Sequence, residues 1–487
     1  NPTNPNEDND ENLTTFVAGD EAKTRTSLNY NSSDFYWEAG DYIYVKDDDN
    51  VLQKSSNAPT SKVAAFKYKV PGKFTGNSYK VYYLGKNSNG SRVTISTTQT
   101  QTKPDNTEHF GTAGDYGTAT ATKVSGKQQF AFELEHQPAY LVFQPYTSNT
   151  ILQNCYLTKV EVTSDNDIAE TYTVNTSTDN LDASAVTGGK KIVLTTSGSS
   201  SNPNGFPLSN SSASVTTNGA YMVIKPGTHT LKVRYWVKDV ATHVEGTITK
   251  TLPATAYASN TYYDMTANLE VKNNYDGDKY YMWDAQQNYW AGHEWNSLSP
   301  WQPTLTTQPA NSNYAQSNTD PRYYNEAFTN GADNKATHTS CKDLPNVNEM
   351  TWYAAKGEPR WDGDELWTTM GHLYKGGMWF KKKANISGFN PNTVEDGTDW
   401  RTNSIGGAWS VSQTLPDAAD AGNYFYLPAL GYYSSGQLYN VGNHGSYWSS
   451  SADPWLSGYA YSLVFTSGSV DVSSDYRDSG FRSEALQ

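Results

Sequence analysis

The sequence predicts a mostly β protein in which two successive β-sandwich domains are followed by an α+β domain. Residues 1–272 contain short runs of alternating apolar and polar residues, with turn-forming residues between them and no convincing helical pattern. Twelve of the fourteen tryptophans lie between Trp283 and Trp455, so a new domain is expected to begin near residue 272. A length of 487 residues also fits roughly three domains of about 150 residues each.

The composition is typical of an extracellular β protein. Hydrophobic residues make up only 36% of the chain, but 36 tyrosines and 14 tryptophans supply much of the apolar area that a core needs. Charged residues make up 18%, and Ser, Thr and Asn fill most polar positions. A net charge of −14 argues against nucleic acid or anionic lipid as partners. The chain has no apolar run long enough to span a bilayer and no signal peptide, so a secreted protein would be present in mature or trimmed form.

The two cysteines, Cys155 and Cys341, fall in different predicted domains. A disulfide framework within one domain is therefore excluded, and we expect two free thiols.

The first 26 residues are expected to form a leader. Residues 1–12 are polar and should be disordered, whereas Leu13–Val17 is typical of one short strand. A polar hinge, residues 20–26, follows this strand.

Residues 27–148 are predicted to form an N-terminal β-sandwich, and residues 149–272 a second one. The strands expected in the first are Trp37–Val45, Tyr79–Leu84, Phe130–Glu135 and Tyr140–Phe143. The strands expected in the second are Cys155–Val162, Lys191–Thr195, Tyr221–Lys225 and Thr230–Lys238. Alternation along the last strand predicts that Lys232, Arg234 and Lys238 face solvent while the apolar residues between Leu231 and Val237 face the core.

Residues 273–487 form the predicted third domain. After a loop rich in Asn, Thr and Pro that extends to about residue 340, Asn346 caps a helix that ends at Gly357. Tyr459–Phe465 and Val470–Val472 predict a hairpin. The aromatic blocks 361–364 and 376–379 are expected to be irregular. Residues 423–451, rich in both tyrosine and glycine, predict a long packed loop in which most rings lie in the core.

Three short motifs resemble the fimbrillin-like pilins of anaerobic Gram-negative bacteria. They are Thr24-Arg25-Thr26, Trp37-x-x-Gly40-Asp41-x-Ile43 and Phe132-x-Leu134-x-His136-x-x-Ala139. The resemblance covers roughly residues 13–272. It implies two transthyretin-like sandwiches and export as a lipoprotein, so that the precursor's lipid anchor is the only association with the outer membrane.

The same resemblance implies an assembly mechanism. A trypsin-like protease would cut after Arg25, and the strand at Leu13–Val17 would then be replaced by a donor strand from another pilin subunit. The expected location is an extracellular pilus at the cell surface, reached by export through the outer membrane.

A second set of motifs, spread over residues 280–482, resembles the lectin-like fold related to C-type lectins and formylglycine-generating enzymes. These motifs are Leu344-Pro345-x-x-x-Glu349, Gly377-Met378-Trp379, Leu427-Pro428-Ala429-x-Gly431, Tyr447-Trp448-Ser449-Ser450-Ser451 and Gly480-Phe481-Arg482. The chain departs from the family in two ways. Ser483 and Glu484 follow Arg482 where related domains commonly have a cysteine, and the calcium-binding tripeptides of sugar-binding C-type lectins are missing.

An enzyme is not expected, and neither is a cofactor or a metal. Asp362, Asp364 and Glu365 lie beside Trp361, as the carboxylates and stacking platform of a glycosidase could, but nothing in the sequence sets their separation. The eight histidines are scattered and form no metal-binding motif. The chemistry of formylglycine-generating enzymes uses active-site cysteines, of which this region has only Cys341.

Binding is the function that the sequence predicts for the third domain. Exposed aromatic rings flanked by Asn, Asp or His suit a sugar or a protein epitope. The candidate ligand-binding residues are Asn443, His444, Tyr447, Asp453, Trp455, Trp361 and Asp362. Together with the pilin resemblance, they predict a pilus tip adhesin for a glycan or protein ligand on a host or a neighbouring bacterium. The alternatives are a glycan-binding or glycan-degrading protein of a polysaccharide utilisation system and a structural stalk subunit without a ligand.

Overall fold

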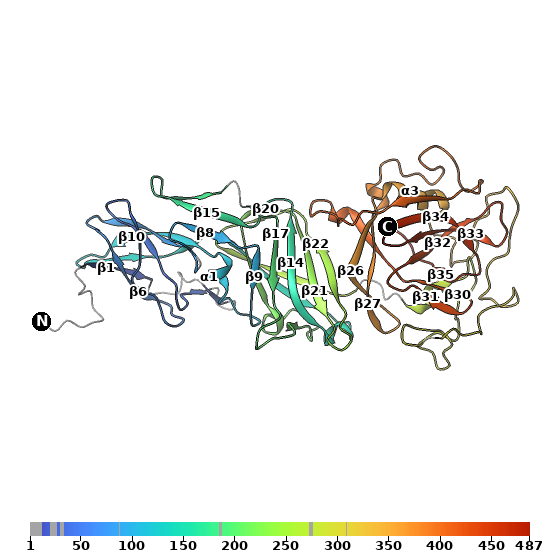
Figure 1. Ribbon diagram of the computed structural model, residues 1–487, viewed down its shortest axis with the longest axis horizontal. Helices are drawn as coiled ribbons and strands as arrows, with labels where there is room; N and C mark the ends of the chain where they lie inside the picture. The colour runs from blue at the N-terminus through green and yellow to red at the C-terminus, as the bar shows by residue number, and fades with distance from the viewer. Residues whose placement is uncertain are drawn as a thin grey trace. The chain divides into compact units, whose positions relative to one another are not determined.

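A computed structural model describes residues 12–19, 27–29, 34–86, 88–184, 188–271, 276–307 and 309–487. The protein is mostly β, as predicted (Figure 1). It divides into two compact units, which are described separately below. The first comprises Asn1–His243 and Thr249–Glu270, and the second comprises Val244–Ile248 and Val271–Gln487. The division falls within β22 (Glu245–Thr251). The domain limits at residues 26, 148 and 272 stay predictions.

The first strand, β1 (Leu13–Ala18), is an interior strand of a sheet in the first unit and confirms the strand predicted at Leu13–Val17. It pairs antiparallel with β6 (Phe66–Pro71) on one side and parallel with β11 (Gln129–Phe132) on the other. The other strands of this sheet are β5 (Leu52–Lys54), β4 (Tyr44–Lys46), β7 (Ser78–Tyr83), β10 (Gly117–Lys123) and β12 (Glu135–His136). Phe16 points into the core of this sheet, where it packs with Phe74, Tyr79 and Phe130.

Several of the remaining strands of the first unit pair across the predicted limit at residue 148, namely β13 (Ala139–Tyr146), β8 (Arg92–Ile95) and β9 (Thr98–Thr100) with later strands. β13 pairs antiparallel with β19 (Ala220–Ile224) and parallel with β24 (Thr261–Asn268). β14 (Tyr156–Ser164) pairs with β17 (Lys191–Thr195), β18 (Phe206–Pro207) and β21 (Leu231–Lys238). β17 also pairs with β9. β15 (Glu170–Asn175) pairs with β8 and β16 (Asn180–Ala183). Two small ribbons are β2 (Ser27–Asn29) with β3 (Asp34–Tyr36) and β20 (Gly227–His229) with β23 (Thr255–Tyr257).

Two expectations for the first unit are wrong. Short helices do occur, namely α1 (Phe110–Ala113), α2 (Val215–Asn218) and the 3₁₀ turn η1 (Leu152–Asn154), but single turns are too short to give a helical pattern in the sequence. In β21, Lys232 and Arg234 are only 6% and 3% exposed rather than facing solvent. Arg234 lies opposite Glu161 of β14, and its Nε is 3.7 Å from the Glu161 carboxylate, so the buried charge has a partner.

His109, which precedes α1, gives the first unit an expected pH dependence. Its Nε2 lies 2.8 Å from the carbonyl oxygen of Tyr221 in β19, and burial lowers the pKa of the ring from 6.5 to about 4. The folded state therefore favours the neutral ring. The stability that His109 contributes is present above pH 6.5 and is lost as the pH falls through about 4. We expect His109→Gln to lose less stability than the wild type between these two pH values, as measured by urea denaturation. An equal loss in both proteins would contradict this.

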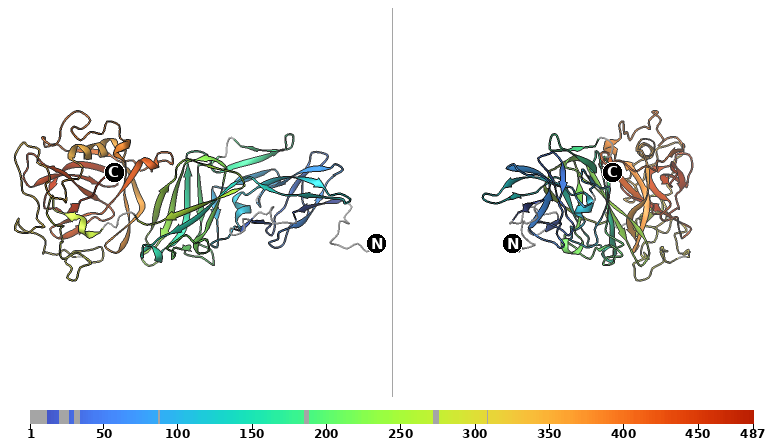
Figure 2. Two further views of the ribbon diagram at one scale, coloured as in Figure 1. Left: turned by 180° about the vertical axis from the view of Figure 1, so that it is seen from behind. Right: turned by 60° about the vertical axis from the view of Figure 1, so that its left-hand side comes forward.

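The main sheet of the second unit is crossed on one face by the helix α3 (Val347–Lys356) (Figure 2). The strands of the sheet are, in order, β25 (Tyr280–Tyr281), β35 (Phe481–Arg482), β32 (Gly445–Ala452), β33 (Tyr459–Phe465), β34 (Ser469–Tyr476) and β28 (Gly407–Ser410). A second group of paired strands consists of β26 (Arg360–Thr369), β27 (His372–Lys381) and β29 (Tyr424–Pro428). The 3₁₀ turns are η2 (Gly277–Lys279), η3 (Lys383–Asn385) and η4 (Ala421–Asn423).

The helix and the hairpin predicted for the third domain are confirmed. Asn346 caps α3 with its side chain, Glu349 completes the capping box, and Gly357 is the C-cap. The hairpin is β33–β34, with Val470 and Val472 buried.

The packed loop predicted at residues 423–451 is wrong, because this stretch contains four strands. They are β29, β30 (Tyr432–Ser434), β31 (Gln437–Tyr439) and β32. The glycines that suggested a loop include Gly436, which follows Ser435 in a two-residue hairpin turn where both residues have positive φ (47° and 77°). Most of the rings are buried, as expected. The blocks 361–364 and 376–379 are also strands, in β26 and β27, with a register shift between Asp362 and Leu366.

Both thiols are free, as predicted, and both are buried. Burial raises the pKa of the Cys155 and Cys341 thiols to about 12, so neither is reactive near neutral pH. Among the described residues, no helix has the length and apolar character that crossing a bilayer requires.

Candidate ligand-binding site

The first group of predicted ligand residues lies where the chain enters β32. Asn443 is exposed in the preceding turn, and His444 is half-buried beside Tyr432, with burial lowering the pKa of its ring. Tyr447 is fully buried, and its hydroxyl donates a hydrogen bond to the carbonyl oxygen of Pro428. In this structure Tyr447 is therefore a core residue, while Asn443 is open to solvent.

A second group, Asp453 and Trp455, lies in the connection from β32 to β33. The Asp453 carboxylate is fully buried and accepts hydrogen bonds from the backbone N–H groups of Trp455 (2.8 Å) and Leu456 (3.0 Å). It also accepts from the hydroxyls of Ser404 (2.8 Å) and Ser474. Trp455 itself is 53% exposed. Asp453 thus holds the turn that presents Trp455 to solvent.

Trp361 and Asp362 form a third group in β26. Trp361 is half-buried and packs against the core of the second unit. Asp362 is buried, and its carboxylate accepts hydrogen bonds from the indole N–H of Trp379 (2.9 Å) and the backbone N–H of Asp364 (3.0 Å). The predicted residues thus come from two turns and two strands, and as a binding site they stay a prediction. Arg25 lies outside the described residues.

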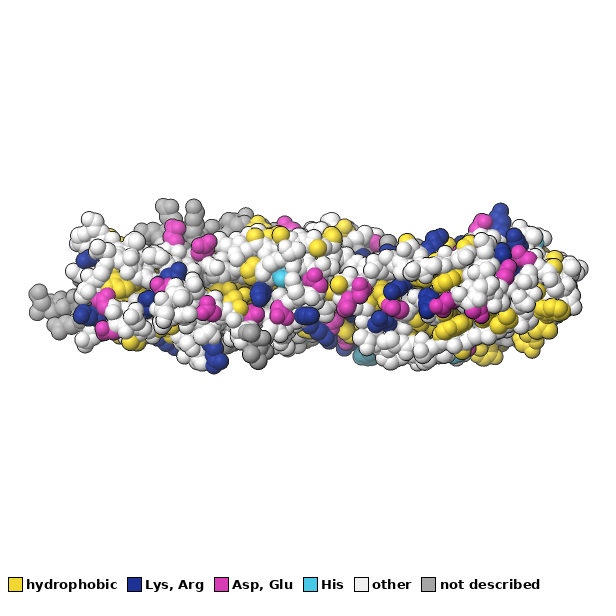
Figure 3. Space-filling model, turned by 90° about the horizontal axis from the view of Figure 1, so that it is seen from above, with side chains coloured by type: hydrophobic (Ala, Val, Ile, Leu, Met, Phe, Trp, Pro, Cys, Tyr) yellow, Lys and Arg dark blue, Asp and Glu magenta, His cyan; other side chains and the backbone are white. Residues whose placement is uncertain are grey.

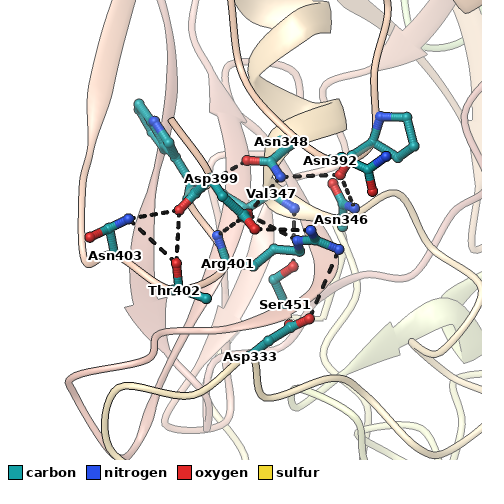
Figure 4. A network of polar contacts seen from close by, with 12 residues as sticks. Asp333, Asn346, Val347, Asn348, Asn392, Asp399, Arg401, Thr402, Asn403 and Ser451 are labelled. Atoms are coloured by element: carbon teal, nitrogen blue, oxygen red, sulfur yellow. Dashed lines mark hydrogen bonds and ion pairs between the residues drawn. The ribbon is translucent and has the colours of Figure 1, made fainter. Parts of the chain in front are cut away.

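A polar network fixes the loop before β28 against the start of α3 (Figure 4). The buried Asn348 of α3 donates a hydrogen bond to the Asp399 carboxylate at 2.9 Å and accepts one from the backbone N–H of Trp400. Arg401 donates to both oxygens of Asp399 at 2.9 Å and lies 3.9 Å from Asp333. The Asp399 and Asn348 oxygens in this network thus accept hydrogen bonds from protein donors. In the described part of the chain, no group of three or more His, Cys, Asp or Glu residues could hold a metal ion.

The second unit also contains a cavity of about 740 Å³ that was not among the predicted sites. This is within the range of small-molecule sites, about 300–1,000 Å³. Its walls come from the loop after Trp290 and from the turn that joins β26 to β27. The lining residues are Trp295, Pro300, Trp301, Gln302, Pro303, Thr304, Thr306, Thr307, Pro309, Ala310, Asn311, Met370, Gly371 and His372.

Two buried side chains hold the floor of this cavity. The Gln302 side chain accepts a hydrogen bond from the backbone N–H of Trp295 (3.0 Å) and donates to the carbonyl oxygen of Gly277 (3.0 Å). It also donates to the hydroxyl of Tyr433 (3.2 Å), which in turn donates to the carbonyl oxygen of Pro303. Because Gln302 and Tyr433 are almost completely buried, this side of the cavity is fixed by core side chains, whereas Thr306, Thr307, Pro309 and Ala310 line it from an exposed loop.

The aromatic walls are held equally firmly. Trp301 stacks on His293 with ring centroids 3.3 Å apart and planes 8° apart, and the Arg322 guanidinium lies 5.7 Å from the Trp301 ring centroid. Trp295 lies against the tight turn at Gly371, where φ is +79° and a Cβ would be 3.5 Å from the indole ring. Another residue there would strain the backbone, and its Cβ would be in van der Waals contact with the indole.

Hydroxyl and imidazole groups also line the cavity. Thr304, Thr306 and Thr307 form a compact turn in which the Thr304 hydroxyl lies 3.3 and 3.0 Å from the hydroxyls of the other two. Thr306 Oγ1 is 3.4 Å from Nε2 of His372. Thr306 and Thr307 are exposed, so a ligand could reach both.

Sequence reasoning missed the cavity because it predicts only a loop for residues 293–340. The order Trp-Gln-Pro-Thr at 301–304 is the one local signal, since it places an aromatic ring, an amide and a hydroxyl within one turn around a proline. Residues 370–372, which form another part of the lining, are distant in the sequence, and no local pattern shows that they lie near residues 301–304.

The protein is thus mostly β and has a cavity of ligand size in its second unit. The sequence matches no protein-family model and no curated protein. Among solved structures, it is similar to a putative cell adhesion protein from Bacteroides ovatus, with 15% identity over 53% of this chain and 93% of that chain and a TM-score of 0.32. It is also similar to the fimbrial anchor protein Mfa2 from Porphyromonas gingivalis, with 14% identity over 49% of this chain and 82% of that chain and a TM-score of 0.23. A fimbrial protein from Bacteroides ovatus is similar with 11% identity over 94% of this chain and 97% of that chain and a TM-score of 0.25.

Proposed function

We propose that this protein is a cell-surface fimbrial subunit that acts as an adhesin, with its second unit binding a ligand on a host or a neighbouring bacterium. The observation that carries the binding role is the cavity of about 740 Å³ between Trp295, Trp301 and His372. A stalk subunit without a ligand would have no need to hold two tryptophans and a threonine turn around an open space. Burial of Gln302 and Tyr433 beneath that space supports a site whose shape is set before the ligand arrives.

Incorporation into a fibre is proposed to occur through the first unit. β1 lies between β6 and β11 and is paired with both by backbone hydrogen bonds. Its removal would therefore leave one edge of each neighbouring strand unpaired. A donor strand from another pilin subunit could fill this gap by β-augmentation. The proposal includes cleavage at Arg25, a precursor with a lipid anchor and a position at the pilus tip, all of which rest on the motif resemblance.

The binding role can be tested with the full chain on arrays of glycans and of host and bacterial surface proteins. We expect saturable binding to one of these classes and no turnover of a polysaccharide panel. The absence of any binding would favour a structural stalk subunit. Release of reducing sugar from a polysaccharide would favour a glycan-degrading protein of a utilisation system.

A further inference from the structure

The lining of the second-unit cavity indicates the chemical class of its ligand. Its described lining residues include apolar surfaces from tryptophan, proline and methionine, together with hydroxyl, amide and imidazole groups, but no carboxylate, lysine or arginine. We propose that the cavity binds a neutral saccharide, an inference that rests on the adhesin function proposed above and specifies its ligand.

The apolar part of the lining suits the C–H faces of a sugar ring. Trp295 and Trp301 are half-buried; the backbone N–H of Trp295 donates to the Gln302 side chain, and the Trp301 ring stacks on His293. A ligand that covers the accessible parts of these indoles gains apolar contact area without having to order the rings first. Aromatic side chains combine a large contact area with a low entropic cost, which is why they suit sites for weakly apolar ligands.

The polar part of the lining suits the hydroxyl edge of the same ligand. A threonine hydroxyl can donate one hydrogen bond and accept two, and a sugar hydroxyl has the same capacity. Thr306 and Thr307 are exposed at the cavity, Asn311 offers an amide, and His372 offers a ring nitrogen beside Thr306. An entirely apolar ligand would remove water from these groups without replacing the hydrogen bonds that the water made, which disfavours its binding.

The lack of charged groups among the described lining residues favours neutral saccharides over charged polar ligands. A sialylated or sulfated glycan carries an acidic group, and none of the described lining residues is a lysine or arginine that could pair with it; the Arg322 guanidinium near Trp301 already pairs with Asp320. A basic peptide would need a carboxylate in the lining, which is likewise missing from its described residues. The neutral saccharide is therefore the class that leaves the fewest groups unpaired.

The test uses the full chain, a glycan array that contains neutral, sialylated and sulfated members, and titration calorimetry with the neutral glycans that bind. Two variants remove polar contacts with little effect on packing, Thr306→Val and His372→Ala, and one removes a wall, Trp295→Ala. Matched controls outside the cavity are Thr319→Val and Tyr476→Ala, both at exposed positions. Circular dichroism checks that each variant is folded.

We expect neutral glycans to bind and each cavity variant to weaken that binding by about tenfold, while the two controls retain it. Preference for anionic glycans, or unchanged binding in Thr306→Val and His372→Ala, would overturn the inference even if Trp295→Ala failed to fold. Binding to a protein that survives its enzymatic deglycosylation would overturn the saccharide inference but leave the adhesin function standing. No binding to any glycan or protein would overturn both.

Discussion

Replacing Phe16 by alanine is expected to lower the free energy of unfolding of the first unit by about 3–5 kcal/mol. Phe16 is fully buried in β1, with its ring stacked on Phe130 at 5.1 Å and edge-on to Phe74 at 5.1 Å. The substitution removes a large apolar side chain between β6 and β11, whose backbones are held apart by β1 and cannot close over the cavity. The expected cost is therefore at the upper end for a buried phenylalanine.

Hydrogen exchange of backbone amides measures this loss strand by strand. Amides of β6 and β11 should exchange much faster in Phe16→Ala, whereas amides of β32 and β33 in the second unit should be unchanged and so provide an internal control. Val17→Ala is the matched variant, because Val17 is half-buried on the same strand and should cost only about 1 kcal/mol. Similar effects of the two variants would mean that β1 contributes little packing to the sheet.

The second large effect is expected from Asp453→Ala, which should lower the stability of the second unit by about 3 kcal/mol or more. The buried carboxylate accepts hydrogen bonds from two backbone N–H groups and two serine hydroxyls, and alanine would leave these donors without it. The connection between β32 and β33 should also loosen, so the fluorescence of Trp455 should become more sensitive to a soluble quencher.

Asp453→Asn separates hydrogen bonding from charge at this site. Its carbonyl oxygen can accept from the N–H groups of Trp455 and Leu456, and the hydroxyls of Ser404 and Ser474 can turn to accept from its amide. We therefore expect this variant to retain most of the stability, as measured by thermal unfolding with both variants side by side. A loss as large as in Asp453→Ala would indicate that the negative charge itself is required.

Much of the fold could be predicted where a single local pattern decides the structure. Asn346, Glu349 and Gly357 define α3 because capping is a property of a few neighbouring residues. The predicted burial of Leu231 and Val237 in β21 is right for the same reason. The expected exposure of Arg234 is wrong because a sequence does not reveal that Glu161 lies opposite it on the neighbouring strand.

Glycine gave a misleading signal in the second unit. Gly445 belongs to β32, where a Cβ would lie 2.2 Å from the ring of Phe465 on the neighbouring strand β33. Its small size therefore accommodates a cross-strand aromatic ring rather than a flexible loop. A glycine that makes room for a ring and a glycine in a flexible loop give the same composition, and only the pairing of β32 with β33 distinguishes the two cases.

The candidate site was harder to predict than the fold. Asp453 and Trp455 have the residue types of a binding site, yet the structure gives Asp453 a buried role as an acceptor and leaves Trp455 exposed. Exposed apolar side chains also gather over the second unit, as Figure 3 shows on its right-hand side, so an aromatic ring at the surface does not by itself identify a site. The cavity depends on Trp301 and His372 meeting in space, which no local pattern encodes.

The position of β1 has a consequence for the order in which the first unit folds. As the chain is synthesised, β1 emerges first and β6 soon after, but β11 becomes available only when residues 129–132 have been added. Until then one edge of β1 has no neighbour, and the pairing that completes the sheet joins segments far apart in the sequence, which is a slow kind of contact to form. In a nascent chain this edge of β1 therefore stays open until β11 has been added, and during that interval mispairing with another chain competes with folding.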